Sequence, residues 1–324
     1  MLILGECMDI TYLLWLQDFR NSIHDAWTPF MESASLFAIT YLVLLPVFVY
    51  WCIHKRKGLF TLGALYFCMA INVLVKLTAC VYRPWIRDVR ILPAGDSIKT
   101  ATGYSFPSGH TAIGTAIYGG LALSCWKNNK LKWFALLCII AILITGFSRN
   151  YLGVHTPQDV LVGLLLGAFS LWFTWKVFGY VDKHPEQENK VLLAIIIASV
   201  AALVYVIYKP YPTDYVNGKL LVDPKKMMNN GFTNFGALIG FCVARFIEKQ
   251  WIKFQPTGLT VKGIILALIG FAPLVWMINK FSPLMIGWTG PHMGRFLAQF
   301  LMVFYIVAFY PFILKCFCGT HKNA

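Results

Sequence analysis

Residues 145–159 (TGFSRNYLGVHTPQD) place an arginine, a histidine and an aspartate between two long apolar runs. Arg149 precedes His155 by six positions, and Asp159 follows His155 by four. Ionisable side chains are costly in a membrane-embedded sequence, so their presence there favours a functional site. Imidazole can act as a nucleophile or a general acid near neutral pH. A carboxylate one turn later can accept from its Nδ1–H and fix the tautomer.

A second cluster, residues 76–84, contributes two more cations. Lys76 and Arg83 are seven positions apart, so a helix would carry both on one face. Pro84 disfavours helix for the residue before it, so we expect Arg83 to turn inward where the helix ends. Arginine donates to two phosphate oxygens at once, whereas lysine acts as a point charge. Together with Arg149, these cations match a phosphate dianion and the extra charge of a five-coordinate transition state.

The third cluster, residues 107–110 (PSGH), is expected to open a helix. The free backbone N–H groups of a helix start suit an anion, the Ser108 hydroxyl can donate as well, and Gly109 lets the backbone approach closely. We predict a phosphate-transfer site that needs neither a metal nor a cofactor. Its catalytic residues are predicted to be His155, His110 and Asp159, and its phosphate-binding residues Lys76, Arg83, Ser108, Gly109 and Arg149.

Each of these residues also has a simpler explanation. Residues 156–159 (TPQD) look like an N-cap, a first-turn proline and a capping-box acid, and this structural role for Asp159 is compatible with the catalytic one. Lys76 could extend its ammonium group from a helix end, and Ser108 could only start a helix. A histidine at a helix end is more often a polar surface group than a catalyst. These explanations would have to hold independently for eight residues, which favours the single site.

Composition decides what kind of chain must position these residues. The sequence is 58% hydrophobic and 13% charged, with a mean hydropathy of +0.64. It is therefore far more apolar than a soluble domain, and runs of about 20 apolar residues recur. We predict an all-α fold, a polytopic transmembrane helical bundle. The net charge of +14 does not indicate nucleic acid as a partner, because no basic stripe gathers on a soluble domain.

We predict an interfacial helix at 9–20 and about nine spans. Their approximate limits are 33–53, 59–79, 108–126, 131–147, 157–178, 191–208, 231–246, 259–278 and 293–314. With alternating spans, the end of the second, the start of the third, the end of the fourth and the start of the fifth share one membrane face. The clusters at 76–84, 107–110 and 148–159 therefore converge. This divides the chain into an extracytoplasmic N-terminal segment (1–32), a phosphatase core (33–208) and a three-span C-terminal extension (209–324).

The basic residues predict the orientation. On one side of the membrane the predicted loops hold 15 Lys or Arg and 4 Asp or Glu, and on the other side they hold 13 Lys or Arg and 10 Asp or Glu. Cytoplasmic loops carry an excess of Lys and Arg, so we expect the first side to be cytoplasmic. The N-terminus and the three clusters then face outward or toward an organelle lumen, and the C-terminus is cytoplasmic. Because the ionisable residues fall at helix ends and not at mid-membrane, a transporter or channel is disfavoured.

The three clusters resemble the signature of the type-2 phosphatidic acid phosphatase superfamily, which includes lipid phosphate phosphatases, glucose-6-phosphatase and vanadium haloperoxidases. That signature, K-x6-RP, PSGH and SR-x5-H-x3-D, is matched at every specified position within residues 76–159. The resemblance implies that His155 attacks phosphorus to give a phosphohistidine and that Asp159 orients it. It implies that His110 protonates the leaving oxygen and then activates water. The remaining five residues would hold the phosphoryl oxygens.

The first functional hypothesis is a membrane phosphatase that hydrolyses lipid phosphate or diphosphate monoesters at the outer leaflet. Undecaprenyl pyrophosphate, phosphatidic acid and phosphatidylglycerophosphate are the candidate substrates, and membrane lipids and the phosphorylated substrate are the expected partners. One alternative is a glucose-6-phosphatase-like hydrolase of a soluble sugar phosphate, which the nine-span plan resembles. Another is a phosphotransferase that passes the phosphoryl group from one lipid to another.

Overall fold

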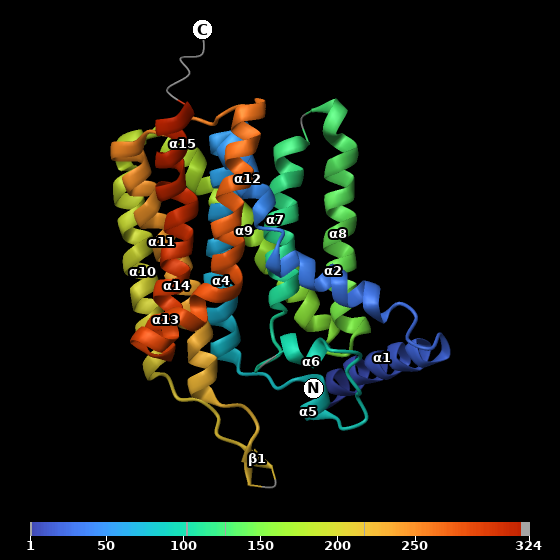
Figure 1. Cartoon of the computed structure of the whole chain (residues 1–324). Coiled ribbons are helices and arrows are strands. Elements are labelled where there is room, and N and C mark those ends of the chain that lie inside the picture. Colours follow the sequence, from blue (N-terminus) through green and yellow to red (C-terminus); the bar gives the residue numbers. More distant parts are fainter. Residues whose placement is uncertain (1, 102, 127, 217, 319–324) are drawn as a thin grey trace. The chain divides into compact units, whose positions relative to one another are not determined.

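The computed structural model describes residues 2–101, 103–126, 128–216 and 218–318, and this part of the chain is almost entirely helical (Figure 1). The α-helices are α1 (Leu2–Ser22), α2 (Thr28–Thr40), α3 (Leu44–Phe48), α4 (Lys55–Ala79), α5 (Pro84–Arg87), α6 (Ser97–Thr100), α7 (Gly109–Cys125), α8 (Lys132–Tyr151), α9 (Pro157–Lys183), α10 (Glu188–Tyr208), α11 (Pro224–Ile247), α12 (Val261–Trp276), α13 (Ser282–Thr289), α14 (Pro291–Phe304) and α15 (Tyr310–Cys318). Short π- or 3-10-helical turns are η1 (Val49–Ile53), η2 (Asn129–Leu131), η3 (Pro185–Gln187), η4 (Glu248–Ile252), η5 (Met277–Phe281) and η6 (Tyr305–Phe309). The strands β1 (Tyr215–Val216) and β2 (Lys219–Leu220) pair antiparallel.

Within the described residues, six helical stretches are long and apolar enough to cross a membrane. They are Lys55–Arg87, Asn129–Tyr151, Pro157–Lys183, Pro185–Tyr208, Val261–Thr289 and Pro291–Cys318. The chain is therefore an integral membrane protein, and the predicted all-α class is confirmed. The helices α7 and α11 coincide with two further predicted spans but are not among these six. The count of nine spans stays a prediction.

The first predicted span, 33–53, is not one helix. α2 ends at Thr40, three residues form a turn, and α3 begins at Leu44. Pro46 explains the break, because a proline has no N–H for the carbonyl four residues earlier and its ring clashes with that carbonyl. Here that residue is Leu42, whose carbonyl accepts from Leu45 N at 3.1 Å in a tighter turn.

The chain divides into two compact units. Unit 1 comprises Met1–Tyr41, Ile71–Ser170 and Lys209–Met227, and unit 2 comprises Leu42–Ala70, Leu171–Tyr208 and Met228–Ala324. Helices α4 and α9 each contribute residues to both units. The predicted segments 1–32, 33–208 and 209–324 follow chain order, whereas unit 1 takes residues from all three. That division by chain order stays a prediction.

Small residues bring the helices of unit 1 close together. α7 and α8 lie side by side, and α2 packs against both (Figure 1). A Cβ on Gly163 of α9 would lie 2.7 Å from the Ser108 carbonyl oxygen at the start of α7. A Cβ on Gly167 would likewise lie 2.5 Å from Thr115 Cβ, so both substitutions would push α9 away from α7. This packing holds the first turns of α7 and α9 next to each other.

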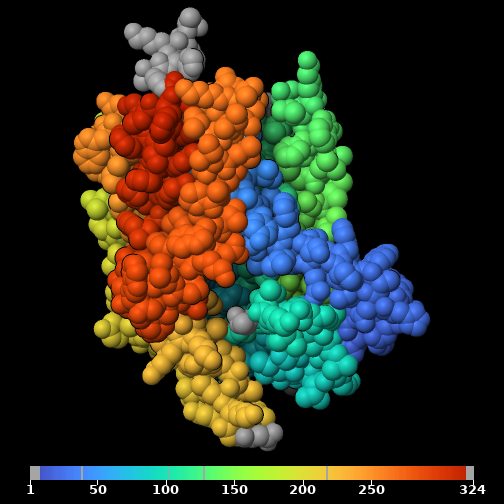
Figure 2. Space-filling model, viewed as in Figure 1, coloured from blue at the N-terminus to red at the C-terminus, as the bar shows by residue number. Residues whose placement is uncertain are grey.

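Unit 2 packs around aromatic residues. The Trp51 ring is fully buried, its Nε1 donates to the Ile306 carbonyl at 2.9 Å, and it stacks on Phe271 with ring centroids 5.3 Å apart. In contrast, α12 and α15, whose surfaces are visible in orange and red in Figure 2, expose large apolar side chains such as Leu268 and Phe312. Exposed apolar surface of this kind is typical of helices that face lipid.

Candidate active site

All eight candidate residues lie in unit 1, at or next to the ends of helices: Lys76, Arg83, Ser108, Gly109, His110, Arg149, His155 and Asp159. The end of α4 and the start of α5 carry the first motif. The first turn of α7 carries the second, and the end of α8 with the start of α9 carries the third. Lys76 Nζ donates to the Pro107 carbonyl at 2.6 Å, Arg83 Nη1 lies 2.9 Å from His155 Nε2, and Ser108 N donates to the Asp159 carbonyl at 2.9 Å. The structure therefore brings the three motifs together.

His155 is held in one tautomer. Its Nε2 lies 2.9 Å from Arg83 Nη1, and a guanidinium group can only donate, so Nε2 accepts and the hydrogen is on Nδ1. Nδ1 faces Asp159 Oδ2 at 3.3 Å and Ser105 Oγ at 3.4 Å. The side chain is buried, and Asn150 Nδ2 donates to the His155 carbonyl at 2.9 Å. Nε2, which carries the lone pair, is thus the nitrogen that faces the Arg83 guanidinium group.

Asp159 combines the structural and the orienting roles that the sequence suggested. Thr156 N donates to its Oδ2 at 2.8 Å, and Asp159 N donates to Thr156 Oγ1 at 3.4 Å, which is the reciprocal pattern of a capping box. Ser105 Oγ donates to the same Oδ2 at 2.5 Å. Because Oδ2 also faces His155 Nδ1, the cap that starts α9 fixes the carboxylate beside the imidazole.

Arg83 turns inward where the helix ends, as Pro84 predicted. It adopts an extended conformation (φ −66°, ψ 152°), and its side chain is buried. Arg83 Nε donates to the Gly103 carbonyl at 3.1 Å, and Nη1 donates to the Val154 carbonyl at 2.9 Å as well as to His155. These contacts tie the loop before α7 to the loop before α9.

Lys76 fixes the segment that leads into the second motif. Its ammonium group donates to three backbone carbonyls, those of Tyr104 at 3.2 Å, Ser105 at 2.9 Å and Pro107 at 2.6 Å. An ammonium group has three donors, so these contacts use its full number. In this arrangement Lys76 supplies positive charge and holds the loop that carries Ser105.

Arg149 and His110 present buried donors without a protein partner. Arg149 Nη1 donates to Ser35 Oγ at 2.6 Å, whereas its Nε and Nη2, and His110 Nε2, have no partner among the described residues. A buried polar group left unsatisfied costs about 1–3 kcal/mol, so these nitrogens are available to a bound ligand. Two guanidinium donors on one edge suit two oxygens of one anion. Within the described part of the chain, no three His, Cys, Asp or Glu side chains are grouped as a metal site.

The start of α7 offers further donors to an anion. Ser108 is the N-cap, and its Oγ accepts from Thr111 N at 3.4 Å and from Thr111 Oγ1 at 2.8 Å. Because Oγ is the acceptor in both contacts, its own hydrogen can still be donated. A Cβ on Gly109 would meet only Asn72 Oδ1, at 3.5 Å, so the protein itself does not require glycine here. The close approach of an anion to the backbone would require it.

Comparisons with known proteins agree with this geometry. Residues 57–183 match the PAP2 superfamily. The chain is also 30% identical over 172 residues to the undecaprenyl-diphosphatase BcrC of Bacillus subtilis, an alignment that covers 50% of this chain and 81% of that protein. The chain belongs to the PAP2 superfamily. All eight candidate residues lie within the matched region.

Two other relatives illustrate the range of the family. The lipid phosphate phosphatase delta of Arabidopsis thaliana is 27% identical over 51% of this chain and 41% of its own length. The phosphatidylglycerophosphatase B of Bacillus subtilis is 36% identical over 33% of this chain and 54% of its own length. No solved structure matches the chain. The family and these relatives identify this PAP2 protein as a phosphatase.

Among the residues that contact the PAP2 motifs, three that the sequence did not predict are Ser105, Ser35 and Asn150, the last through the backbone carbonyl of His155. Ser105 lies two positions before the PSGH motif, Ser35 lies in α2, and Asn150 follows Arg149 directly. Serine and asparagine are common in loops and helix starts, so their types carry no signal. Only the folded chain shows that Ser35 meets Arg149 at a separation of 114 residues.

Burial holds the pKa of the His155 imidazole well below its ordinary value, and the cations Arg83, Lys76 and Arg149 lower it further. Desolvation and nearby positive charge both disfavour the imidazolium form. His155 is therefore neutral at neutral pH, which is the form that can act as a nucleophile.

Proposed function

We propose that this protein hydrolyses lipid phosphate or diphosphate monoesters through a phosphohistidine formed on His155. The observation that carries the proposal is the fixed tautomer of His155, with Nδ1 facing Asp159 and the lone pair of Nε2 directed at Arg83. The unpartnered donors of Arg149 and the N-terminus of α7 support it, because both suit the oxygens of the same phosphoryl group.

In the first step, Arg83 Nη1 exchanges its hydrogen bond to His155 Nε2 for one to a phosphoryl oxygen. The freed lone pair of Nε2 then attacks phosphorus while the bond from phosphorus to the leaving oxygen breaks. The negative charge of the bound phosphate favours the protonated form of His110. His110 donates this proton to the leaving oxygen, so the alcohol or the shorter phosphate leaves in protonated form. The developing charge on the equatorial oxygens is met by Arg83, by Arg149 and by the start of α7. Asp159 stabilises the positive charge that grows on the His155 ring.

In the second step, water replaces the histidine. His110, now neutral, takes a proton from the water as its oxygen attacks phosphorus, and the bond between phosphorus and His155 Nε2 breaks. Inorganic phosphate leaves, and both imidazoles return to their starting protonation states. In both steps His155 forms or breaks the bond to phosphorus, and His110 transfers the proton.

A lipid substrate fits the site's position at helix ends. A phosphate at the membrane interface reaches such a site while its apolar chain stays in lipid. The relatives are an undecaprenyl-diphosphatase, a lipid phosphate phosphatase and a phosphatidylglycerophosphatase, and their substrates favour the same class. We further propose that the site faces away from the cytoplasm, because the basic residues concentrate on the other side.

A substrate panel tests this function. Purified protein in detergent is assayed for phosphate release from undecaprenyl diphosphate, phosphatidic acid, phosphatidylglycerophosphate and glucose 6-phosphate, with a chelator present. At least one lipid is expected to be hydrolysed with a kcat/KM far above that of the sugar phosphate. Release from glucose 6-phosphate alone would contradict the lipid proposal, and transfer to a second lipid without free phosphate would contradict hydrolysis.

The pH dependence should reflect the lowered pKa of His155. A depressed pKa means that the neutral, reactive imidazole persists to lower pH, so activity is lost only as pH falls through that pKa. The acid limb of kcat/KM is expected below about pH 6.5, the ordinary histidine value. The substrate phosphate titrates near pH 6 as well, so the rate of His155 modification by diethylpyrocarbonate serves as a substrate-free control. A modification midpoint at or above that ordinary value would contradict the expectation.

Ser105 is expected to act as a positioning residue. Ser105→Ala removes a hydrogen bond of 2.5 Å to the Asp159 carboxylate, and kcat should fall about tenfold because bonds to charged groups contribute roughly 1.5–3 kcal/mol. KM should change little, since the hydroxyl of Ser105 contacts Asp159 and His155 and is not one of the proposed phosphate-binding donors. Ser105→Thr keeps the hydroxyl and should recover most of the rate. An equal loss in both variants would point to packing instead.

A further inference from the structure

A cavity of about 690 Å³ lies within unit 2, lined by residues of α4, α9, α10 and α11 together with the segment after η4. None of the eight candidate active-site residues lines it. Its volume falls within the range of roughly 300–1,000 Å³ that small-molecule sites occupy. The cavity therefore has the size of a ligand site, and the catalytic chemistry does not account for it.

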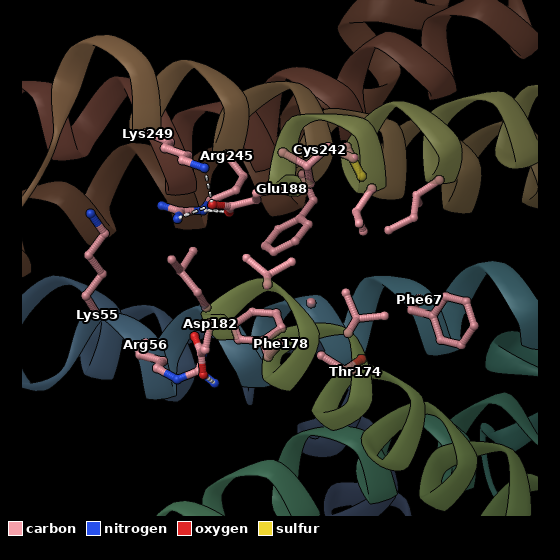
Figure 3. A pocket seen from close by; sticks show the side chains of 18 of the residues that line it. Lys55, Arg56, Phe67, Thr174, Phe178, Asp182, Glu188, Cys242, Arg245 and Lys249 are labelled. Carbon is pink, nitrogen blue, oxygen red and sulfur yellow. Dashed lines mark hydrogen bonds and ion pairs between the residues drawn. The ribbon is translucent and has the colours of Figure 1, made fainter. Parts of the chain in front are cut away.

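The cavity is apolar over most of its length. Figure 3 shows Phe67 and Lys55 at opposite ends, with the side chain of Phe178 between them. Both end residues lie on α4, where twelve positions correspond to roughly 18 Å along the axis. The hydrocarbon of one leaflet is about 15 Å thick, half of a bilayer core. The cavity thus matches one hydrocarbon chain in length and in polarity.

Positive charge gathers at one end. In Figure 3 the charged side chains lie toward Lys55 and away from Phe67. Among the described residues that line the cavity, four are Lys or Arg and two are Asp or Glu. Arg56 pairs with Asp182, and both Arg245 and Lys249 pair with Glu188, at 2.8 and 2.9 Å. Two cations thus share one carboxylate, and the cavity lining carries more positive than negative side chains.

A third carboxylate reduces this excess but does not remove it. Glu248 does not line the cavity, is fully buried, and accepts from Lys55 Nζ at 2.6 Å and also from Arg245. Four cations then face three carboxylates. The remaining charge is positive, at the end of an apolar channel within a membrane protein, which is the complement of an anionic amphiphile.

We propose that this cavity binds an anionic membrane phospholipid, with one acyl chain along Phe178 and Phe67 and the headgroup phosphate between Arg56 and Lys249. A soluble anion would leave the apolar length without a partner, and a zwitterionic lipid would leave the excess positive charge unmatched. The site is independent of phosphohistidine chemistry, so it stands whether or not the substrate is a lipid.

Lipid retention tests the headgroup part of the proposal. The full-length protein is reconstituted into phosphatidylcholine vesicles containing phosphatidylglycerol, extracted in mild detergent, and examined by native mass spectrometry. Phosphatidylglycerol is expected to be retained in preference to phosphatidylcholine. The double variant Arg56→Gln and Lys249→Gln should lose at least about tenfold in affinity for phosphatidylglycerol, because charge-assisted bonds to phosphate are lost.

A matched control removes the same charge elsewhere. Lys225 and Lys226 are exposed and do not line the cavity, so the double variant Lys225→Gln and Lys226→Gln should retain phosphatidylglycerol as the original protein does. Equal retention of both lipids by the original protein, or equal loss in the two double variants, would overturn the proposal.

Photochemical cross-linking tests the acyl chain separately. A phosphatidylglycerol with a diazirine in its chain is expected to label peptides that contain Phe67 or Phe178, and unlabelled phosphatidylglycerol should compete. Val177→Trp places an indole in the cavity and should abolish this label without changing any charge. Labelling that falls equally on the exposed face of α12 and resists competition would show only a general lipid shell.

Discussion

Replacing His155 with glutamine is expected to lower the rate of phosphate release by about four orders of magnitude or more, since the variant lacks the nucleophile. Glutamine can still occupy the position between Arg83 and Asp159, because its amide both donates and accepts. The fold should therefore survive, and thermal unfolding should show a similar midpoint. His184→Gln, at a side chain that is 50% exposed, is the matched control and should keep full activity.

The covalent intermediate separates the roles of the two histidines. With a p-nitrophenyl phosphate ester the leaving oxygen needs little protonation, so His110→Gln should still become phosphorylated, and it should lose the phosphoryl group slowly because water is no longer activated. Acid-labile radiolabel is expected to accumulate in His110→Gln and to be missing from His155→Gln. Label on a residue other than His155, or normal turnover by His155→Gln, would refute the proposed mechanism.

The convergence of the three motifs could be predicted because the chemistry of a phosphate site restricts the residue types. A phosphate site needs cations, a nucleophile and a helix start, and alternating spans place the ends that carry them on one face. The sequence also supported two roles for Asp159, and the structure shows the capping box and the contact to His155 on one oxygen. Motif spacing and helix-end rules together were therefore enough to predict which residues meet.

What could not be predicted depends on contacts between distant segments. Lys76 was expected to face phosphate, yet its ammonium group holds the carbonyls of Tyr104, Ser105 and Pro107. No pattern of residue types predicts such a contact, because every residue has a backbone carbonyl that could accept. The break before α3 is a different case. Pro46 was a visible reason for it, but the continuous apolar run around Pro46 led to the prediction of a single span. The charged end of the unit 2 cavity also arises only when four separate helices meet.

Arg149 should be the cation least tolerant of conservative change. Its Nη1 is fixed by Ser35 at 2.6 Å, and Nε and Nη2, which have no partner in the described part of the chain, are the donors that we propose for the phosphoryl group. Lysine keeps the charge but has no planar pair of donors, so Arg149→Lys is expected to lower kcat/KM by roughly 10²–10³-fold. Inhibition by orthovanadate, which mimics the five-coordinate phosphoryl group, should weaken by a similar factor.

Ser35→Ala provides the comparison that assigns this loss to the anion. It removes the anchor and leaves both free donors, so the loss should be about tenfold or less. If Arg149 acted only as a structural cation, the ranking would change: Arg149→Lys would be mild, and vanadate inhibition would be equal in both variants. If Arg149→Lys lowered kcat/KM without weakening the binding of orthovanadate, the guanidinium would serve the packing of α8 against α2 and not the phosphoryl group.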